Sequence, residues 1–289
     1  SDPMHKFPDI PIVEIGPGTQ PTAREEGLEY MTMPSGMATY HQPILPEPED
    51  AAGMEQGKRA LEQVLRALRQ WRRNGPIEVV DLDPLDADNL DFVNQALGEG
   101  EVSVAFDGPS PIRAQESVLA GVWRVQHLDG HGHVIRDAIE IGEVPDMVRS
   151  AAFSDADPEL DSACDRSDPA IQNAPALLVE LAEKLGNYRP GDSPHTLNLT
   201  LLPLTETDVM LLGERLGVGP VTILSRGYGN CRIGSTARRN GWWIKYFNSQ
   251  DVLILNTIEV VDVPSVAIAA PEDIADSIER LDEILGMYR

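Results

Sequence analysis

The sequence has 289 residues, a formal net charge of -24 and two cysteines, and its hydrophobic content of 42% is ample for packed cores. Two cysteines exclude a disulfide-stapled scaffold, and no apolar run is long enough to cross a bilayer. So acidic a chain repels phosphate backbones, which argues against nucleic acid and favours basic peptides or proteins as partners, unless the negative surface only keeps the protein soluble.

Residues 1–50 predict an extended arm and not a domain. Eight prolines between residues 5 and 50 forbid long helices and remove hydrogen-bond donors from any strand. Apolar strings such as Ile10-Pro11-Ile12-Val13 are too hydrophobic for a free disordered tail. We therefore expect the arm to pack along the globular body, with Met31, Met33 and Met37 as adaptable contacts or, alternatively, as a methionine-rich partner site.

A pattern in the remaining sequence occurs twice. Pro84-Leu85 returns as Pro203-Leu204 at an offset of 119 residues, and the same offset relates the Leu-Gly-x-Gly strings that begin at Leu97 and Leu216. Matching turn residues in one order at a nearly fixed offset indicate self-similarity of the kind that repeat architectures show. The sequence therefore predicts a tandem duplication.

The duplication divides the chain into an arm at residues 1–50, repeat 1 at 57–152, an acidic linker at 153–175 and repeat 2 at 176–289. Each repeat begins with apolar residues at helical spacing, followed by a strand, a second helix, another strand and a β-hairpin. The expected spans are 60–71, 77–82, 86–97, 101–106 and 117–140 in repeat 1, and 176–188, 197–202, 205–216, 220–225 and 240–261 in repeat 2. We predict an α+β fold of two tandem α-β-α-β(meander) repeats related by a pseudo-two-fold axis.

The segments outside the repeats carry their own expectations. The linker is rich in aspartate, which predicts a solvated segment in which Cys164 is an incidental exposed thiol. From Pro271 to Tyr288, a buried stripe at helical spacing predicts a helix that closes the sheet of repeat 2, with a partner-binding helix as the alternative.

The stretch from Ser225 to Phe247 reverses the sign of the charge, because it holds five cations and no carboxylate. Its glycines favour a bend, and residues 241–247 have the aromatic and β-branched content of a strand. Guanidinium groups beside tryptophan suit a carboxylate-bearing peptide, whereas a solvated face that balances the acidic body is the alternative. The candidate partner-binding residues are Arg226, Gly227, Tyr228, Gly229, Asn230, Cys231, Arg232, Arg238, Arg239 and Trp242.

One tryptophan of this stretch is expected to be structural. Gly121-Val122-Trp123 resembles Gly241-Trp242-Trp243 at an offset of 120, which pairs Trp243 with Trp123. A residue type that the fold needs occurs in both repeats, whereas a residue found in one repeat only is a candidate for function. We therefore predict that Trp243 belongs to the core.

Cys231 has two interpretations. Arg226 and Arg232 nearby in the sequence favour a lowered thiol pKa and a reactive or metal-binding cysteine, provided that the side chain is exposed. Its counterpart in the first repeat is Ile112, which favours a core position where cysteine acts as a small apolar residue. Both interpretations remain open at this point.

A second group of possible metal ligands is His127, His131 and His133, spaced H-x3-H-x-H. Asp129-Gly130 lies at the turn that Asn248-Ser249 occupies in the second repeat, so turn chemistry accounts for the segment without a metal. No Walker loop, dinucleotide fingerprint, H-E-x-x-H, C-x-x-C or nucleophile elbow occurs. We therefore expect no enzyme, no bound cofactor and no metal.

Several long strings of the chain are unlike general-purpose motifs: G-Y-G-N-C-R-I-G-S-T, W-W-I-K-Y-F-N-S-Q-D and L-I-L-N-T-I-E-V-V-D-V-P, with I-V-E-I-G-P-G-T-Q-P and M-P-S-G-M-x-T-Y in the arm. Together they resemble the HupH/HyaF family of hydrogenase expression and formation proteins. The resemblance implies a cytoplasmic accessory protein, or chaperone, for making a membrane-bound uptake NiFe hydrogenase. It implies, as partners, the small iron-sulfur subunit precursor before export and other hydrogenase accessory proteins. A cysteine-dependent metal- or cofactor-handling protein of the same pathway is the alternative.

Overall fold

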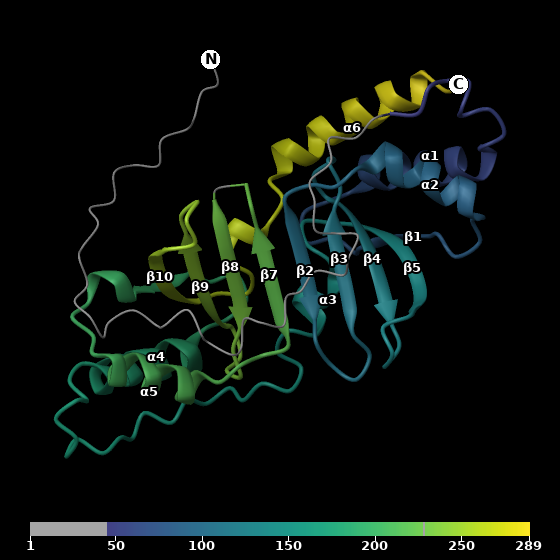
Figure 1. Cartoon of the computed structure of the whole chain (residues 1–289). Helices are drawn as coiled ribbons and strands as arrows, with labels where there is room; N and C mark the ends of the chain where they lie inside the picture. Colours follow the sequence, from purple (N-terminus) through teal and green to yellow (C-terminus); the bar gives the residue numbers. More distant parts are fainter. Residues whose placement is uncertain (1–44, 228) are drawn as a thin grey trace.

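The computed structural model describes residues 45–227 and 229–289, so most of the predicted arm and Tyr228 lie outside the described residues. The described part combines six α-helices with one ten-stranded sheet in which every neighbouring pair is antiparallel (Figure 1). This mixture confirms the predicted α+β class. The elements are α1 (Glu55–Gln70), β1 (Glu78–Asp81), α2 (Ala87–Leu97), β2 (Val102–Phe106), β3 (Ile112–Glu116), β4 (Val122–Leu128), β5 (Val134–Ile141), α3 (Asp146–Ser150), α4 (Ala174–Asn187), β6 (His195–Asn198), the short 3-10 helix η1 (Leu199–Leu201), α5 (Glu206–Leu216), β7 (Val221–Ser225), β8 (Asn230–Ser235), β9 (Gly241–Phe247), β10 (Leu253–Val260), the 3-10 helix η2 (Ser265–Ala267) and α6 (Pro271–Gly286).

The order of strands in the sheet is β1-β5-β4-β3-β2-β7-β8-β9-β10-β6. The first five strands of the sequence therefore form one half of the sheet and the last five form the other. The halves meet where β2 pairs with β7, and Val104 lies directly opposite Ile223 at the middle of that pairing. The four-residue strands β1 and β6 form the two outer edges, and such short edges offer little template for pairing with another chain.

The second helix of each half begins and ends as its sequence predicts. The Asp86 carboxylate accepts a hydrogen bond from the Asn89 backbone at 2.8 Å, and the Thr205 hydroxyl accepts one from the Asp208 backbone at 2.9 Å. Gly98 and Gly217 end the two helices with φ of 56° and 68°, a conformation in which a glycine avoids strain. These caps confirm the predicted spans of α2 and α5.

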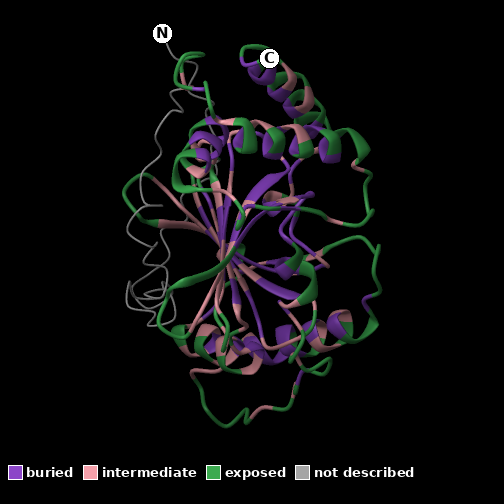
Figure 2. Cartoon of the chain, turned by 90° about the vertical axis from the view of Figure 1, so that its right-hand side faces the viewer, coloured by how far each residue is buried: buried purple, intermediate pink, exposed green. Residues whose placement is uncertain are grey.

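All the large helices lie on one face of the sheet. Residues directly opposite one another in antiparallel strands point to the same face, and one such row crosses eight strands: Ile139, Arg124, Gln115, Ser103, Leu224, Arg232, Lys245 and Asn256. We call the face of this row the helix face. Helices α1, α2 and α6 pack at one end of it and α4 and α5 at the other, as Figures 1 and 2 show. The opposite face holds the central core and is covered by α3 and η2.

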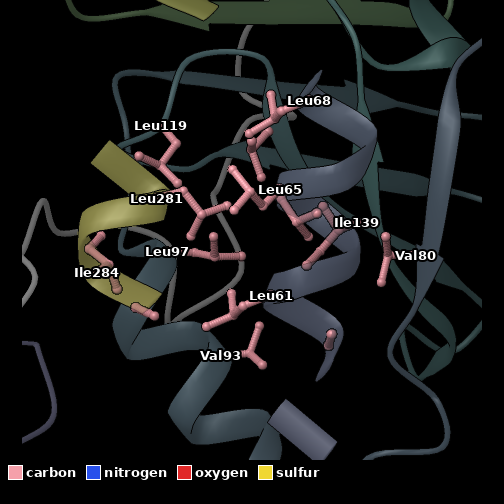
Figure 3. Close-up of a cluster of buried hydrophobic side chains, with 14 of the residues drawn as sticks. Leu61, Leu65, Leu68, Val80, Val93, Leu97, Leu119, Ile139, Leu281 and Ile284 are labelled. Carbon is pink, nitrogen blue, oxygen red and sulfur yellow. The ribbon is translucent and has the colours of Figure 1, made fainter. Parts of the chain in front are cut away.

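The C-terminal helix does not close the second half, so that prediction was wrong. Ile274, Leu281, Ile284 and Leu285 of α6 are buried in the first-half cluster with α1 and α2. Figure 3 shows this packing for Leu281 and Ile284. The Ser277 hydroxyl also donates to the Ala120 carbonyl at 3.0 Å. The apolar stripe of α6 was read correctly from the sequence, but a stripe does not specify which apolar surface covers it.

The acidic linker is anchored although its carboxylates are solvated. Leu160 is buried in the cluster formed by α4 and α5, and the Arg215 guanidinium donates to the Asp161 carbonyl at 3.0 Å. The backbone of Asp157 exchanges two 3.0 Å hydrogen bonds, with the Ala237 carbonyl and the Arg239 N–H. The carboxylates point to solvent as predicted, but the backbone lies along the second half instead of hanging free, and Cys164 is half-buried.

Candidate functional site

The cationic stretch from Ser225 to Phe247 folds into the second half's hairpins and not into one compact site. Arg226, Gly227 and Gly229 lie between β7 and β8 at one end of the strands, whereas Arg238 and Arg239 lie in the connection from β8 to β9 at the other end. The predicted bend is followed at once by strand β8, which the sequence did not predict. The candidate residues therefore divide into two groups a strand length apart.

Cys231 faces the interior. Successive residues of a strand point to opposite faces, so Cys231 lies in the central core, at 1% exposure, while Arg232 lies on the helix face. Burial raises the pKa of the Cys231 thiol to about 12, against a smaller lowering by its hydrogen bond with Tyr246. A thiol in this setting is not accessible to a partner and holds little thiolate at neutral pH.

Cys164 and Cys231 are expected to differ in alkylation by iodoacetamide at pH 8. Cys164 is half-buried in the linker, whereas Cys231 is buried and has a raised pKa, so only Cys164 should be modified in the folded protein. Mass spectrometry of tryptic peptides measures both sites, and Cys231 should react once the protein is unfolded in urea. Equal modification in the folded protein would contradict the burial of Cys231.

The tryptophan predicted to be structural was the wrong one. Trp242 is 0% exposed and its indole N–H donates to the Val261 carbonyl at 3.1 Å, whereas Trp243 is half-buried on the helix face. Trp123 makes the corresponding bond to the Gly142 carbonyl at 3.0 Å. The Gly-x-Trp string that begins at Gly121 and at Gly241 suggested an offset of 120. In the sheet, Trp123 pairs with Glu116 and Trp242 pairs with Ser235, so the two tryptophans correspond at an offset of 119. Trp242 is therefore not available to a partner.

Arg238 and Arg239 hold the linker in place. The Arg238 guanidinium donates to the Arg215 carbonyl at 2.8 Å and lies 3.4 Å from the Asp157 carboxylate. The Arg239 backbone N–H donates to the Asp157 carbonyl. Arg238 thus has a structural role, and Arg239 is the exposed cation at this end of β8.

The helix face of the second half carries a group of cations and aromatic rings. The Arg232 guanidinium lies 4.6 Å from the centre of the Phe247 ring, and the Lys245 ammonium lies 5.3 Å from the centre of the Trp243 ring. Both are cation–π distances. We call these four residues the cationic-aromatic strip.

Trp243 of the cationic-aromatic strip also contacts the neighbouring elements β10 and α5. The Trp243 indole N–H donates to the Asn256 carboxamide at 2.5 Å, and the backbone of α5 at Gly213 comes close to the same ring. A Cβ at Gly213 would lie 3.8 Å from the ring, in ordinary contact. Lys245 and Phe247 were not among the candidate residues expected from the sequence, although alternation along β9 places them on the same face as Trp243.

The histidine segment forms a turn. The Asp129 carboxylate accepts hydrogen bonds from the backbone N–H groups of His131 and His133 at 2.8 and 2.9 Å. The Asn248 carboxamide accepts the same pair of bonds from Gln250 and Val252. No group of three or more potential metal ligands occurs in residues 45–227 and 229–289.

Comparison with known proteins identifies the family. The model of the HupH hydrogenase expression protein, C-terminal conserved region, matches the chain twice, at residues 55–165 and at residues 171–288. The chain belongs to the HupH hydrogenase expression protein family. The HupH/HyaF resemblance read from the sequence is thereby confirmed.

Relatives of this HupH-family chain match it over nearly its whole length. It is 46% identical to the hydrogenase expression/formation protein HoxQ of Cupriavidus necator, over 98% of each chain. It is 44% identical to the hydrogenase expression/formation protein HupH of Rhodobacter capsulatus, over 97% of this chain and 98% of the relative. The hydrogenase-1 operon protein HyaF of Escherichia coli is 33% identical over 93% of this chain and 94% of its own. None of the helices in the described part of this chain is long and apolar enough to cross a membrane.

Proposed function

We propose that this protein is a non-enzymatic accessory protein in the maturation of an uptake NiFe hydrogenase, and that it binds the immature small, iron-sulfur subunit in the cytoplasm before export. The observation that carries the proposal is the 46% identity, over 98% of the chain, to a protein named for hydrogenase expression and formation. Likeness over the full length supports a role of the whole protein in that pathway, together with other hydrogenase accessory proteins.

The charge of the chain supports capture of a basic segment. A formal net charge of -24 gives an attractive field for a cationic export signal, such as a twin-arginine signal, and speeds encounter with it. Such attraction is screened by salt, so binding that depends on it weakens as ionic strength rises.

We further propose that the scaffold consists of two copies of one unit, related by a pseudo-two-fold axis through the β2–β7 pairing, with the linker at 153–175 between them. The double match of one family model supports this. So does the order of strands, in which β5, β4, β3 and β2 lead to the centre and β7, β8, β9 and β10 lead away from it. At the centre, Val104 and Ile223 are opposed and are 119 residues apart.

Side-chain bonds that recur at the same offset support the same proposal. The indole N–H groups of Trp123 and Trp242 donate to the carbonyls of Gly142 and Val261, and both the two donors and the two acceptors are 119 residues apart. Asn89 and Asp208, which also differ by 119, each accept a hydrogen bond at the start of the neighbouring first helix. Bonds that recur in both halves mark what the scaffold needs.

The alternative of a cysteine-dependent metal- or cofactor-handling protein has no specific observation in its favour. Cys231 is buried and its thiol pKa is raised, which opposes both nucleophilic attack and metal ligation by this residue.

Co-purification from cells that express the cognate hydrogenase tests the proposed function. The affinity-tagged protein should retain the small subunit precursor, identified by mass spectrometry, and should retain less of it at high salt or after deletion of the export signal. A protein of the same net charge from outside the pathway serves as the control for charge alone. If the precursor is absent, or if retention is the same with the control, the proposed function is wrong.

A further inference from the structure

The two halves differ in charge where β2–β3 and β7–β8 are connected. In the first half the Arg113 guanidinium donates to the Asp107 carboxylate at 2.9 Å and to the Phe106 and Ile112 carbonyls at 3.1 Å each. At the offset of 119 the second half has Arg232 for Arg113, but Arg226 stands where Asp107 would be. The arginine is kept, and the carboxylate that neutralises it is replaced by a second arginine.

The residues around Arg232 are also more cationic than those around Arg113. Its guanidinium lies on the ring of Phe247, which corresponds to Leu128, and directly opposite it on β9 is Lys245, which corresponds to Gln126. The first half thus holds one anion, one cation and one neutral side chain at three positions where the second half holds three cations. Like charges at directly opposed positions of neighbouring strands repel.

The neighbouring position on β9 also differs. In the first half the Arg124 guanidinium pairs with the Asp137 carboxylate at 2.6 Å and reaches Asn94 on α2. In the second half the position of Arg124 is taken by Trp243, and Asn256 stands in place of Asp137. The first half therefore has an ion pair, Arg124–Asp137, where the second half has a hydrogen bond between two neutral side chains, Trp243 and Asn256.

Arg226 and Arg232 are placed so that a partner can reach them, whereas Lys245 is buried. Arg226 is exposed, Arg232 is half-buried, and Arg232 forms no ion pair within residues 45–227 and 229–289. Lys245 is 9% exposed and adds positive potential beneath them. Two carboxylates lie near this end of β8: that of Glu101 next to Gly227, and that of Asp251, which accepts from the Asn230 carboxamide at 3.3 Å.

We propose that Arg226 and the cationic-aromatic strip bind an acidic, carboxylate-bearing segment of the protein partner. A guanidinium forms paired hydrogen bonds with a carboxylate, and an arginine already held over an aromatic ring loses little freedom when it binds. The acidic body of the protein disfavours a nucleic acid at the same surface. The inference rests on the proposed duplication and deepens the proposed function, since it assigns the recognition surface to the second half.

The variant Arg226→Asp tests this proposal without disturbing the fold, because it restores the Asp–Arg pair that the first half contains. Binding of a fluorescein-labelled octaglutamate peptide to the full chain is followed by fluorescence anisotropy at low ionic strength. We expect the wild-type protein to bind the peptide and Arg226→Asp to bind it at least about tenfold more weakly. Arg66→Asp, the same charge change at an exposed position of α1, should stay within about twofold of wild type.

Four outcomes of these binding experiments would overturn the proposal. No binding by the wild-type protein, equal binding by wild type and Arg226→Asp, or an equal loss in Arg66→Asp would overturn the proposal. Tighter binding of an oligouridylate RNA than of octaglutamate would overturn it as well, because the surface would then prefer phosphate groups to carboxylates. The peptide assay needs no hydrogenase, so its outcome is independent of the co-purification experiment. Failure of the wild-type protein to retain the small subunit precursor counts against the proposed function only.

Discussion

Asp208→Ala is expected to lower the free energy of unfolding by about 3–5 kcal/mol. Asp208 is 0% exposed, and its carboxylate accepts hydrogen bonds from the backbone N–H groups of Gln172, Asn173, Ala174 and Thr205. These donors lie at the end of the linker, at the start of α4 and at the cap of α5. Alanine leaves them without an acceptor in a buried site, and an orphaned buried donor costs about 1–3 kcal/mol.

Urea denaturation followed by circular dichroism measures this loss. Asp208→Asn is the matched variant, because it keeps an acceptor oxygen and recreates Asn89, whose carboxamide accepts from the Gly57 N–H in the first half. It should lose about 1–2 kcal/mol. A loss below about 1 kcal/mol for Asp208→Ala would show that water satisfies the four donors and that the carboxylate does not hold the linker to the helices.

The pKa of Asp208 predicts how this stabilisation depends on pH. Burial raises the pKa, but the four backbone donors together lower it more, so the pKa in the folded protein lies below its ordinary value. The stabilisation is therefore fully present above the unfolded-state pKa, at about pH 4, and is lost as the pH falls through the lower folded-state pKa. The stability difference between wild type and Asp208→Asn should shrink over that acid range.

Trp242→Ala is expected to lower the free energy of unfolding by about 3–5 kcal/mol, because it removes a large, fully buried side chain. The substitution also orphans the Val261 and Asp262 carbonyls and removes the edge contact with the Phe153 ring. Trp243→Ala, a half-buried neighbour on the other face, should lose less than about 1.5 kcal/mol. Denaturation of the two variants under the same conditions measures the contrast.

In partner binding the order should be reversed: substitution of Trp243 should matter more than substitution of Trp242. Trp243 belongs to the cationic-aromatic strip, so Trp243→Ala should weaken retention of the partner by about tenfold while most of the stability remains. Trp242→Phe, which keeps an aromatic ring in the core, should leave binding within about twofold of wild type. If Trp243→Ala destabilises as much as Trp242→Ala, the division between a core tryptophan and a surface tryptophan is wrong.

Local patterns predicted the helices well, because the signals that fix helix ends act over a few residues. The cap at Asp86 and the glycine at 98 lie within one turn of the helix that they bound, and both were legible in the sequence. Strands β3 and β8 were not predicted, because glycine-containing turn segments precede both, and the alternation of apolar with polar residues such as Arg113 and Arg232 was not taken as a strand signal. Pairing with two neighbours in the sheet makes such segments strands, and the neighbours are set by long-range contacts.

The candidate site was predicted only in part. Charge reversal and glycine content drew attention to residues 226–239, but neighbours in the sequence were assumed to be neighbours in space. In a strand, Cys231 and Arg232 point to opposite faces, and the two ends of β8 separate Arg226 from Arg238. The residues that share a face with Arg232 come from the adjacent strand β9, at positions set by register.

The sequence by itself determined the class of fold, the helix caps, the recurring pattern and the family, because these follow from local propensity, spacing and long matching strings. Only the tertiary structure decided that α6 covers the first half, that Trp242 and not Trp243 is in the core, and that Arg232 meets Phe247 and Lys245. These depend on strand register and on which apolar surfaces meet. Both are properties of residues far apart in the chain, and burial of the whole core selects among the alternatives that the local sequence leaves open.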